Sequence, residues 1–83
     1  MTDEASGVHR GFGIALGRAR HRRGWTLHDL SSHSGVGSNT IHKIEHGTRD
    51  PRLGTVLALS GALRGEQSLE SFVAQLLREA AEC

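Results

Sequence analysis

The apolar residues of this chain recur at helical spacing in short segments that glycine and proline separate. Side chains three or four positions apart lie on one face of a helix, so each segment predicts a helix with one buried face. No stretch alternates apolar and polar residues for long enough between turn signals to predict a β-strand. The pattern therefore predicts an all-α fold of five helices.

The first predicted helix begins at Val8 or Arg10 and ends at Arg23, because Gly24 can adopt the left-handed conformation that closes a helix. Its expected core face consists of Phe12, Ala15, Leu16 and Ala19. The glycines inside it are Gly11, Gly13 and Gly17. Each glycine costs about 1 kcal/mol relative to alanine, so we expect this helix to depend on packing against its neighbours.

A glycine turn joins the second and third predicted helices. The second helix is expected over 26–34, where Thr26 can cap the first turn and Asp29 can complete a capping box. Gly35 permits the sharp turn that follows, and the third helix is expected over 37–46. The residues expected to point into the core are Leu27, Leu30, Val36, Ile41 and Ile44.

The fourth predicted helix begins at 50–52 and ends before a break at 64–67. The fifth spans 68–81, with Ser68 as its cap. The fourth helix carries Leu53, Val56, Leu57, Ser60 and Leu63 at helical spacing. The fifth carries Leu69, Phe72, Val73, Leu76, Leu77 and Ala80. This last stripe is wider than a peripheral helix of so small a protein needs.

Length and composition indicate one domain. A chain of 83 residues can bury a single core with a narrow margin of stability, and we expect that core over 8–83, after a flexible segment at 1–7. The one cysteine, Cys83, excludes an internal disulfide and suits a reducing compartment. Since 1–7 lacks the features of a secretory signal and no apolar run could span a membrane, we expect a cytoplasmic protein.

Charge is unevenly distributed along the chain. The net charge is +1, but 9–52 contains eight basic and three acidic side chains, whereas the remainder contains two basic and six acidic ones. A basic region beside an acidic one is typical of a phosphate-binding surface joined to an element that does not touch nucleic acid. Many solvated surfaces are also lopsided, so charge alone does not decide.

The segment 25–47 reads WTLHDLSSHSGVGSNTIHKIEHG. It resembles the helix-turn-helix of the phage-repressor-like (XRE, lambda-repressor-like) family in its Gly-Val turn and its Ile-x-x-Ile-Glu-x-Gly stretch. The similarity reaches back to Arg18 and forward through a basic loop with Pro51 to Leu63, without insertion. The resemblance implies a compact five-helix domain that binds double-stranded DNA.

The third helix is expected to face the bases. Its polar side carries Ser38, Asn39, His42, Lys43 and His46. An exposed helix fits the major groove, where asparagine can pair with adenine and lysine can donate to guanine. The resemblance implies that Ser38, Asn39 and Lys43 occupy the principal base-contact positions, with His42 beside them. The alternative is an ordinary solvated helix face.

Phosphate contacts are expected at both ends of the motif. The residues expected to make them are Thr26, His46, Thr48 and Arg49. The family commonly has glutamine after the cap of the second helix, and Leu27 stands there instead, so that contact is not carried over. Arg52 matches a position from which some phage repressors reach the minor groove, although a solvated arginine at a helix start fits equally well.

The resemblance also implies a structural ion pair between Arg20 and Glu45, in which the loss of either partner would leave an unpaired buried charge. The roles of Arg18, Arg22 and Arg23 stay open between a solvated surface and phosphate contact.

The six histidines do not predict a metal site. His42 and His46 lie four apart on one face, but no cysteine or carboxylate completes a ligand set. We expect no metal and no cofactor. Protonation of these two histidines beside phosphates would raise DNA affinity slightly at low pH.

Part of the fifth helix is expected to form a homodimer interface. The residues assigned to it are Leu69, Phe72, Val73, Leu76 and Leu77. A twofold dimer would place two recognition helices about 34 Å apart on an inverted repeat. The alternative is that this helix only closes the core.

These observations favour a transcriptional regulator that controls its own gene and responds to its own concentration, without a small-molecule ligand. Small controller proteins of restriction-modification systems and compact phage repressors are of this kind. No nucleophile, phosphate-binding loop or metal pattern indicates an enzyme. A protein-interaction module, such as an antitoxin that holds a toxin through its C-terminal half, is the main alternative.

Overall fold

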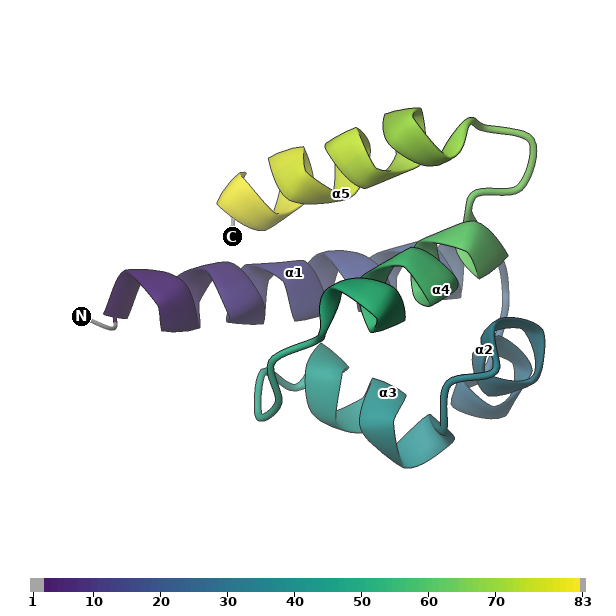
Figure 1. Ribbon diagram of the computed structural model, residues 1–83, viewed down its shortest axis with the longest axis horizontal. Helices are drawn as coiled ribbons and strands as arrows, with labels where there is room; N and C mark the ends of the chain where they lie inside the picture. Colours follow the sequence, from purple (N-terminus) through teal and green to yellow (C-terminus); the bar gives the residue numbers. More distant parts are fainter. Residues whose placement is uncertain (1–2, 83) are drawn as a thin grey trace.

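The computed structural model describes residues 3–82, with side chains from residue 10 onward, and this part of the chain contains five helices and no strand (Figure 1). The helices are α1 (Asp3–Arg22), α2 (Leu27–Ser34), α3 (Ser38–Glu45), α4 (Leu53–Leu63) and α5 (Leu69–Glu82). The all-α prediction is confirmed. The expectation for Cys83 lies outside the described residues.

The two longest helices, α1 and α5, run antiparallel and form one side of the molecule (Figure 1). The short helices α2 and α3 lie on the side of α1 that faces away from α5. The helix α4 packs against both α2 and α5. One core fills the space among them. It consists of Phe12, Ala15, Leu16, Ala19, Leu30, Ile41, Ile44, Leu59, Leu63, Phe72, Leu76 and Ala80.

The first helix is longer than the sequence pattern predicts. It begins at Asp3 and not at Val8 or Arg10, so residues 3–7, expected as a flexible segment, are helical. Once a helix has formed, each added residue gains a backbone hydrogen bond without the cost of a new nucleus. The single Gly7 does not stop this extension.

The glycines of α1 allow close packing. A Cβ added at Gly11 would collide with the carbonyl oxygen of Ala80 in α5, and one at Gly13 would collide with that of Ile44 in α3. The sequence pattern indicates only their cost to helix stability. The structure shows that the same residues let the backbones of three helices approach closely.

The orientation of α4 differs from the expected one. Leu53 and Leu57, expected to point inward, are 73% and 44% exposed. The buried positions are Leu59, which the spacing did not single out, together with Ser60 and Leu63. Leu53 stands in the first turn, beyond the reach of the core, and the inward face begins at the half-buried Val56.

Within the described part of the chain, none of the helices combines the length and apolar character needed to cross a membrane.

Candidate nucleic-acid interface

The third helix has one face anchored in the core and one face open to solvent. Ile41 and Ile44 are 0% and 1% exposed. The side chains proposed to contact bases are Ser38, Asn39, His42 and Lys43, and all of them are exposed. Because 38 and 42, and 39 and 43, are each four residues apart, these polar groups form one continuous surface along the helix.

A sharp turn sets the position of this helix. Gly35 closes α2 with φ +78°, a left-handed conformation that favours glycine, and its N–H donates to the carbonyl oxygen of Ser31. The N–H of Val36 then donates to the hydroxyl of Ser34 at 3.1 Å. Val36 is half-buried against the core, so an apolar anchor follows the turn as predicted.

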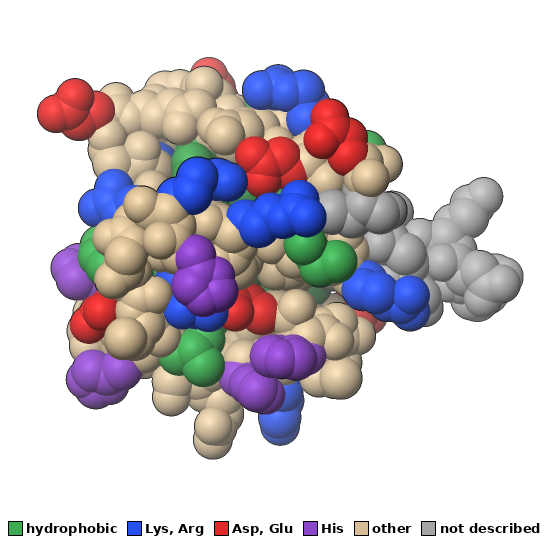
Figure 2. All heavy atoms as spheres, turned by 180° about the vertical axis from the view of Figure 1, so that it is seen from behind, with side chains coloured by type: hydrophobic (Ala, Val, Ile, Leu, Met, Phe, Trp, Pro, Cys, Tyr) green, Lys and Arg blue, Asp and Glu red, His purple; other side chains and the backbone are tan. Residues whose placement is uncertain are grey.

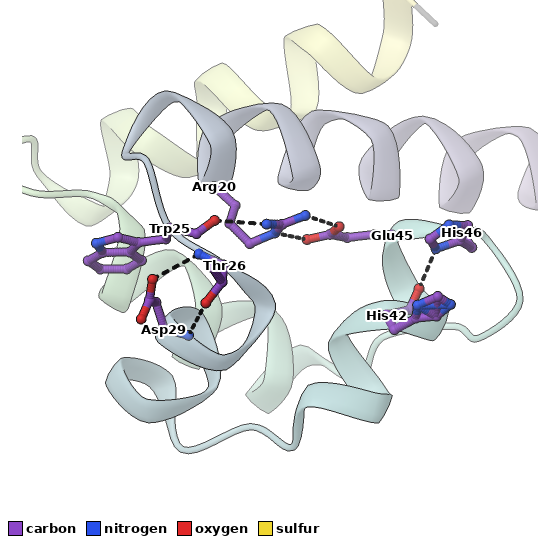
Figure 3. Close-up of polar contacts among 7 residues, drawn as sticks. All are labelled: Arg20, Trp25, Thr26, Asp29, His42, Glu45 and His46. Carbon is purple, nitrogen blue, oxygen red and sulfur yellow. Dashed lines mark hydrogen bonds and ion pairs between the residues drawn. The ribbon is translucent and has the colours of Figure 1, made fainter.

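The start of α2 has the capping box expected from the sequence. Thr26 Oγ1 accepts from the N–H of Asp29 at 3.0 Å, and Asp29 Oδ2 accepts from the N–H of Thr26 at 2.9 Å (Figure 3). The backbone hydrogen bond from Thr26 lowers the pKa of the Asp29 carboxyl. Thr26 Oγ1 acts here as an acceptor, so its O–H can still donate to a phosphate oxygen.

The end of α3 is closed by residues that the sequence assigned to phosphate contact. The ring of His46 donates through Nδ1 to the carbonyl oxygen of His42 at 2.9 Å and stacks on the His42 ring, with centroids 4.1 Å apart (Figure 3). Thr48 donates to the carbonyl oxygen of Lys43 through its N–H at 2.9 Å and its hydroxyl at 3.2 Å. The Thr48 hydroxyl therefore already has an acceptor, and its phosphate contact would have to compete with that bond.

Two exposed arginines border an open hollow of about 320 Å³ beside the helix-turn-helix. The hollow is lined by Arg49 and Arg52, by Thr40 of α3 and by Thr55 of α4. Arg52 occupies the N-cap position of α4 with an extended backbone. Arg49 and Arg52 thus both belong to the stretch that links α3 to α4.

Arg20 and Glu45 form the ion pair that the resemblance implied. Arg20 Nε donates to Glu45 Oε2 at 2.8 Å and Arg20 Nη2 donates to Oε1 at 3.0 Å, while Nη1 donates to the carbonyl oxygen of Trp25 at 2.8 Å (Figure 3). Both side chains are 9% exposed. The hydrogen bonds that Arg20 donates to the Glu45 carboxylate raise the pKa of Arg20, against the opposing effect of burial. The Arg20 guanidinium therefore links α1 to Trp25, just before α2, and to Glu45, the last residue of α3.

Trp25 forms a second contact cluster that sequence reasoning missed. Its ring stacks on His33 with centroids 4.2 Å apart, and the guanidinium of Arg23 lies 4.5 Å from its centroid. Arg22 lies 3.6 Å from a carboxylate oxygen of Glu79 in α5. Of the three arginines that the sequence left open, Arg22 and Arg23 thus have partners within the protein, and Arg18 is exposed. The only sequence signal was the proximity of Arg23 to an aromatic residue.

Basic and histidine side chains spread over the middle and lower part of the face seen in Figure 2, with acidic groups between them. Among the residues whose side chains are described, no group of three or more histidine, cysteine, aspartate and glutamate residues could hold a metal ion.

The expected dimer residues of α5 do not form one surface. Phe72 and Leu76 are 5% and 1% exposed and belong to the core, so their assignment to an interface is wrong. They lie four apart on the face that packs against α1. Leu69 is seven residues, about two turns, before Leu76 and so begins the same face, whereas Val73 and Leu77 each follow a core residue and lie on its flank. Leu77 is 54% exposed, and the other two are half-buried.

Two short helices joined by a left-handed glycine, with the second helix exposed along its polar side, define a helix-turn-helix DNA-binding domain. The chain belongs to the helix-turn-helix domain family, whose model matches residues 12–72. This match is consistent with the resemblance to phage-repressor-like proteins. No curated protein matches the chain.

Proposed function

We propose that this protein is a transcriptional regulator that recognises a specific DNA sequence by inserting α3 into the major groove. The observation that carries the proposal is the division of α3 into two faces, with Ile41 and Ile44 buried and four polar side chains exposed. An exposed polar helix held rigidly by its opposite face is the arrangement that major-groove readout requires.

Within this proposal, Ser38, Asn39, His42 and Lys43 read the bases. Asn39 offers a donor and an acceptor to adenine, and Lys43 offers donors to guanine. The groups that position the protein on phosphates lie at the two ends of the motif. They are Thr26, His46, Thr48 and Arg49. Arg52, at the start of α4, reaches toward the minor groove near the centre of the site and senses its width.

Two copies bind together on an inverted repeat. The protein measures 35 × 26 × 21 Å, so two copies side by side can place their recognition helices about 34 Å apart, one turn of DNA. The flank of α5 that carries Val73 and Leu77, together with Leu69 at the start of the helix, supplies the apolar surface for this homodimer. Such a regulator acts in the cytoplasm and, if it represses its own promoter, its concentration sets the response.

The dimer is tested with a matched pair of variants. Leu77→Glu places a charge on the outer flank of α5, and Leu57→Glu places the same charge at a comparably exposed leucine of α4. We expect sedimentation to show dimers for the wild type and Leu57→Glu, and monomers for Leu77→Glu. A monomeric wild type at micromolar concentration would overturn the proposed dimer. Dissociation by Leu57→Glu and not by Leu77→Glu would indicate that the interface lies on α4 and not on α5.

DNA recognition is tested by titration with DNA from upstream of the protein's own gene and with random DNA of equal length. The Asn39→Ala/Lys43→Ala double variant removes two proposed base contacts, and Arg78→Ala removes one positive charge from an exposed site on α5. We expect the double variant to keep only salt-sensitive, non-selective binding, and Arg78→Ala to stay selective. Loss of selectivity in both would show that overall charge matters and the α3 face does not.

If the wild type prefers neither the upstream DNA nor other promoters, that result favours the alternative that the protein is a protein-interaction module. In that alternative the acidic C-terminal half holds a partner protein, as in an antitoxin. A wild type that binds no duplex selectively would therefore overturn the proposed regulator.

A further inference from the structure

The C-terminal end of α3 rests on a face of α1 that has no side chains at two positions. Gly13, Gly17 and Arg20 follow one another at helical spacing, so they share this face. A Cβ at Gly13 would collide with the carbonyl oxygen of Ile44 and lie 3.0 Å from that of Glu45. A Cβ at Gly17 would lie 3.3 Å from Glu45 Oε1.

Each position of this face accepts a different part of α3. Gly13 leaves room for the backbone of the last turn of α3, and Gly17 leaves room for the side chain of Glu45. Arg20 binds the Glu45 carboxylate at 2.8 and 3.0 Å. The contact at Gly13 is the least adaptable of the three. A flexible carboxylate can move aside, whereas two backbone carbonyl groups of a helix move only if the helix moves.

From this contact we propose that Gly13 is a positioning residue for DNA recognition, because the missing side chain sets how closely α3 approaches α1 and so where its polar face stands. The proposal rests on the function proposed above. Since α3 has eight residues and hydrogen-bonded turns throughout, a shift at Ile44 and Glu45 is carried to Asn39 and Lys43. Hydrogen bonds to bases tolerate a range of only about 0.5 Å in donor–acceptor distance, so a shift approaching 1 Å breaks them.

Gly11 supplies a matched control on the same helix. A Cβ there would collide with the carbonyl oxygen of Ala80 in α5, so the change from glycine to alanine gives the same gain in helix propensity and a similar collision with backbone. The difference is the neighbour that must move. Gly13→Ala displaces the recognition helix, whereas Gly11→Ala displaces α5.

The experiment compares the two variants in DNA binding and in the free state. The probes are the duplex that the wild type selects from a randomised pool and a random duplex of equal length, at a temperature where circular dichroism shows each variant to be folded. The loss of one bidentate base contact corresponds to about tenfold in affinity. We therefore expect Gly13→Ala to lose about tenfold or more on the selected duplex and less than about threefold on the random one, since phosphate contacts persist. We expect Gly11→Ala to stay within about threefold on both.

Amide chemical shifts of the free proteins supply a readout that a general loss of stability would not move. We expect changes across residues 38–48 in Gly13→Ala and across α5 in Gly11→Ala. Equal DNA binding by the two folded variants, or shifts that do not reach 38–43, would overturn the role of Gly13. A wild type that selects no duplex would overturn the proposed function itself. If Gly13→Ala does not fold, both glycine variants are made again in a Ser60→Ala background, because Ser60 is buried in α4, its hydroxyl has no partner among the described residues, and it lies outside the proposed DNA-binding surface. The same expected results and the same overturning results apply to that pair.

Discussion

Removal of the Glu45 carboxylate is expected to destabilise the fold strongly. The two partners are each 9% exposed and share two charge-assisted hydrogen bonds of 2.8 and 3.0 Å. Breaking such a buried pair from one side costs about 3–5 kcal/mol, because the other charge stays in a poor solvent. Arg20 keeps its hydrogen bond to the carbonyl oxygen of Trp25. The cost of Glu45→Ala is therefore expected at the lower end of this range, about 3 kcal/mol.

This loss is large for a protein of 83 residues, whose whole free energy of unfolding is expected to be about 4–12 kcal/mol. The melting temperature should fall by about 12 °C or more, since each 1 kcal/mol shifts it by about 4–8 °C in a domain of this size. Circular dichroism melts and urea titrations of the wild type and Glu45→Ala measure both quantities. A loss below about 1 kcal/mol would refute the reasoning and indicate that water solvates Arg20 in the variant.

A double variant separates the ion pair from the loss of packing. Arg20→Met/Glu45→Leu replaces both charges with apolar groups of similar volume, and such replacements are often neutral or stabilising. We expect the double variant to be more stable than either single alanine variant. If it is less stable than both, the ion pair stabilises the fold by more than the burial of its two charges costs. The single variants Arg20→Met and Glu45→Leu complete a double-mutant cycle that measures the coupling energy.

Three further outcomes follow from single side chains. Ser60 is 0% exposed and its hydroxyl has no hydrogen-bond partner among the described residues, so Ser60→Ala should raise the free energy of unfolding by about 1 kcal/mol in urea titrations; a decrease would reveal a partner for that hydroxyl. Because the pKa of Asp29 is lowered in the folded state, its stabilising effect is present above its ordinary pKa of 3.8 and is lost as pH falls through the lowered value. Melts between pH 5 and pH 2 should therefore show a smaller acid loss in Asp29→Asn than in the wild type, and equal losses would contradict this. Leu59→Ala should cost about 2–5 kcal/mol and Leu53→Ala less than about 0.5 kcal/mol, because the first is 0% and the second 73% exposed; similar costs would contradict the orientation of α4.

The parts of the fold that depend on neighbouring residues could be predicted from the sequence. The capping box of Thr26 and Asp29 and the left-handed turn at Gly35 need only residues within four positions. The inward pair Ile41 and Ile44 follows from the spacing of a strongly amphipathic helix. These features define α2 and α3, so the exposed face of α3 could be predicted as well.

The features that depend on packing between helices could not be predicted. The helix α4 is apolar on most of its surface, so spacing alone did not choose Leu59 over Leu53. The broad stripe of α5 likewise did not tell the buried Phe72 and Leu76 from the exposed Leu77. Their orientation is set by where α1 lies, and that depends on contacts between residues far apart in the sequence.

Stability and the proposed DNA specificity depend on different side chains of α3. The buried isoleucines and the Glu45 carboxylate hold the helix in place, while Asn39 and Lys43 stand in solvent on the other side. Exposed substitutions usually change the free energy of unfolding by no more than about 0.5 kcal/mol. Under the proposed function, a lineage carrying this domain can therefore exchange the residues proposed to read bases, and so acquire new target genes, without rebuilding its core at each step.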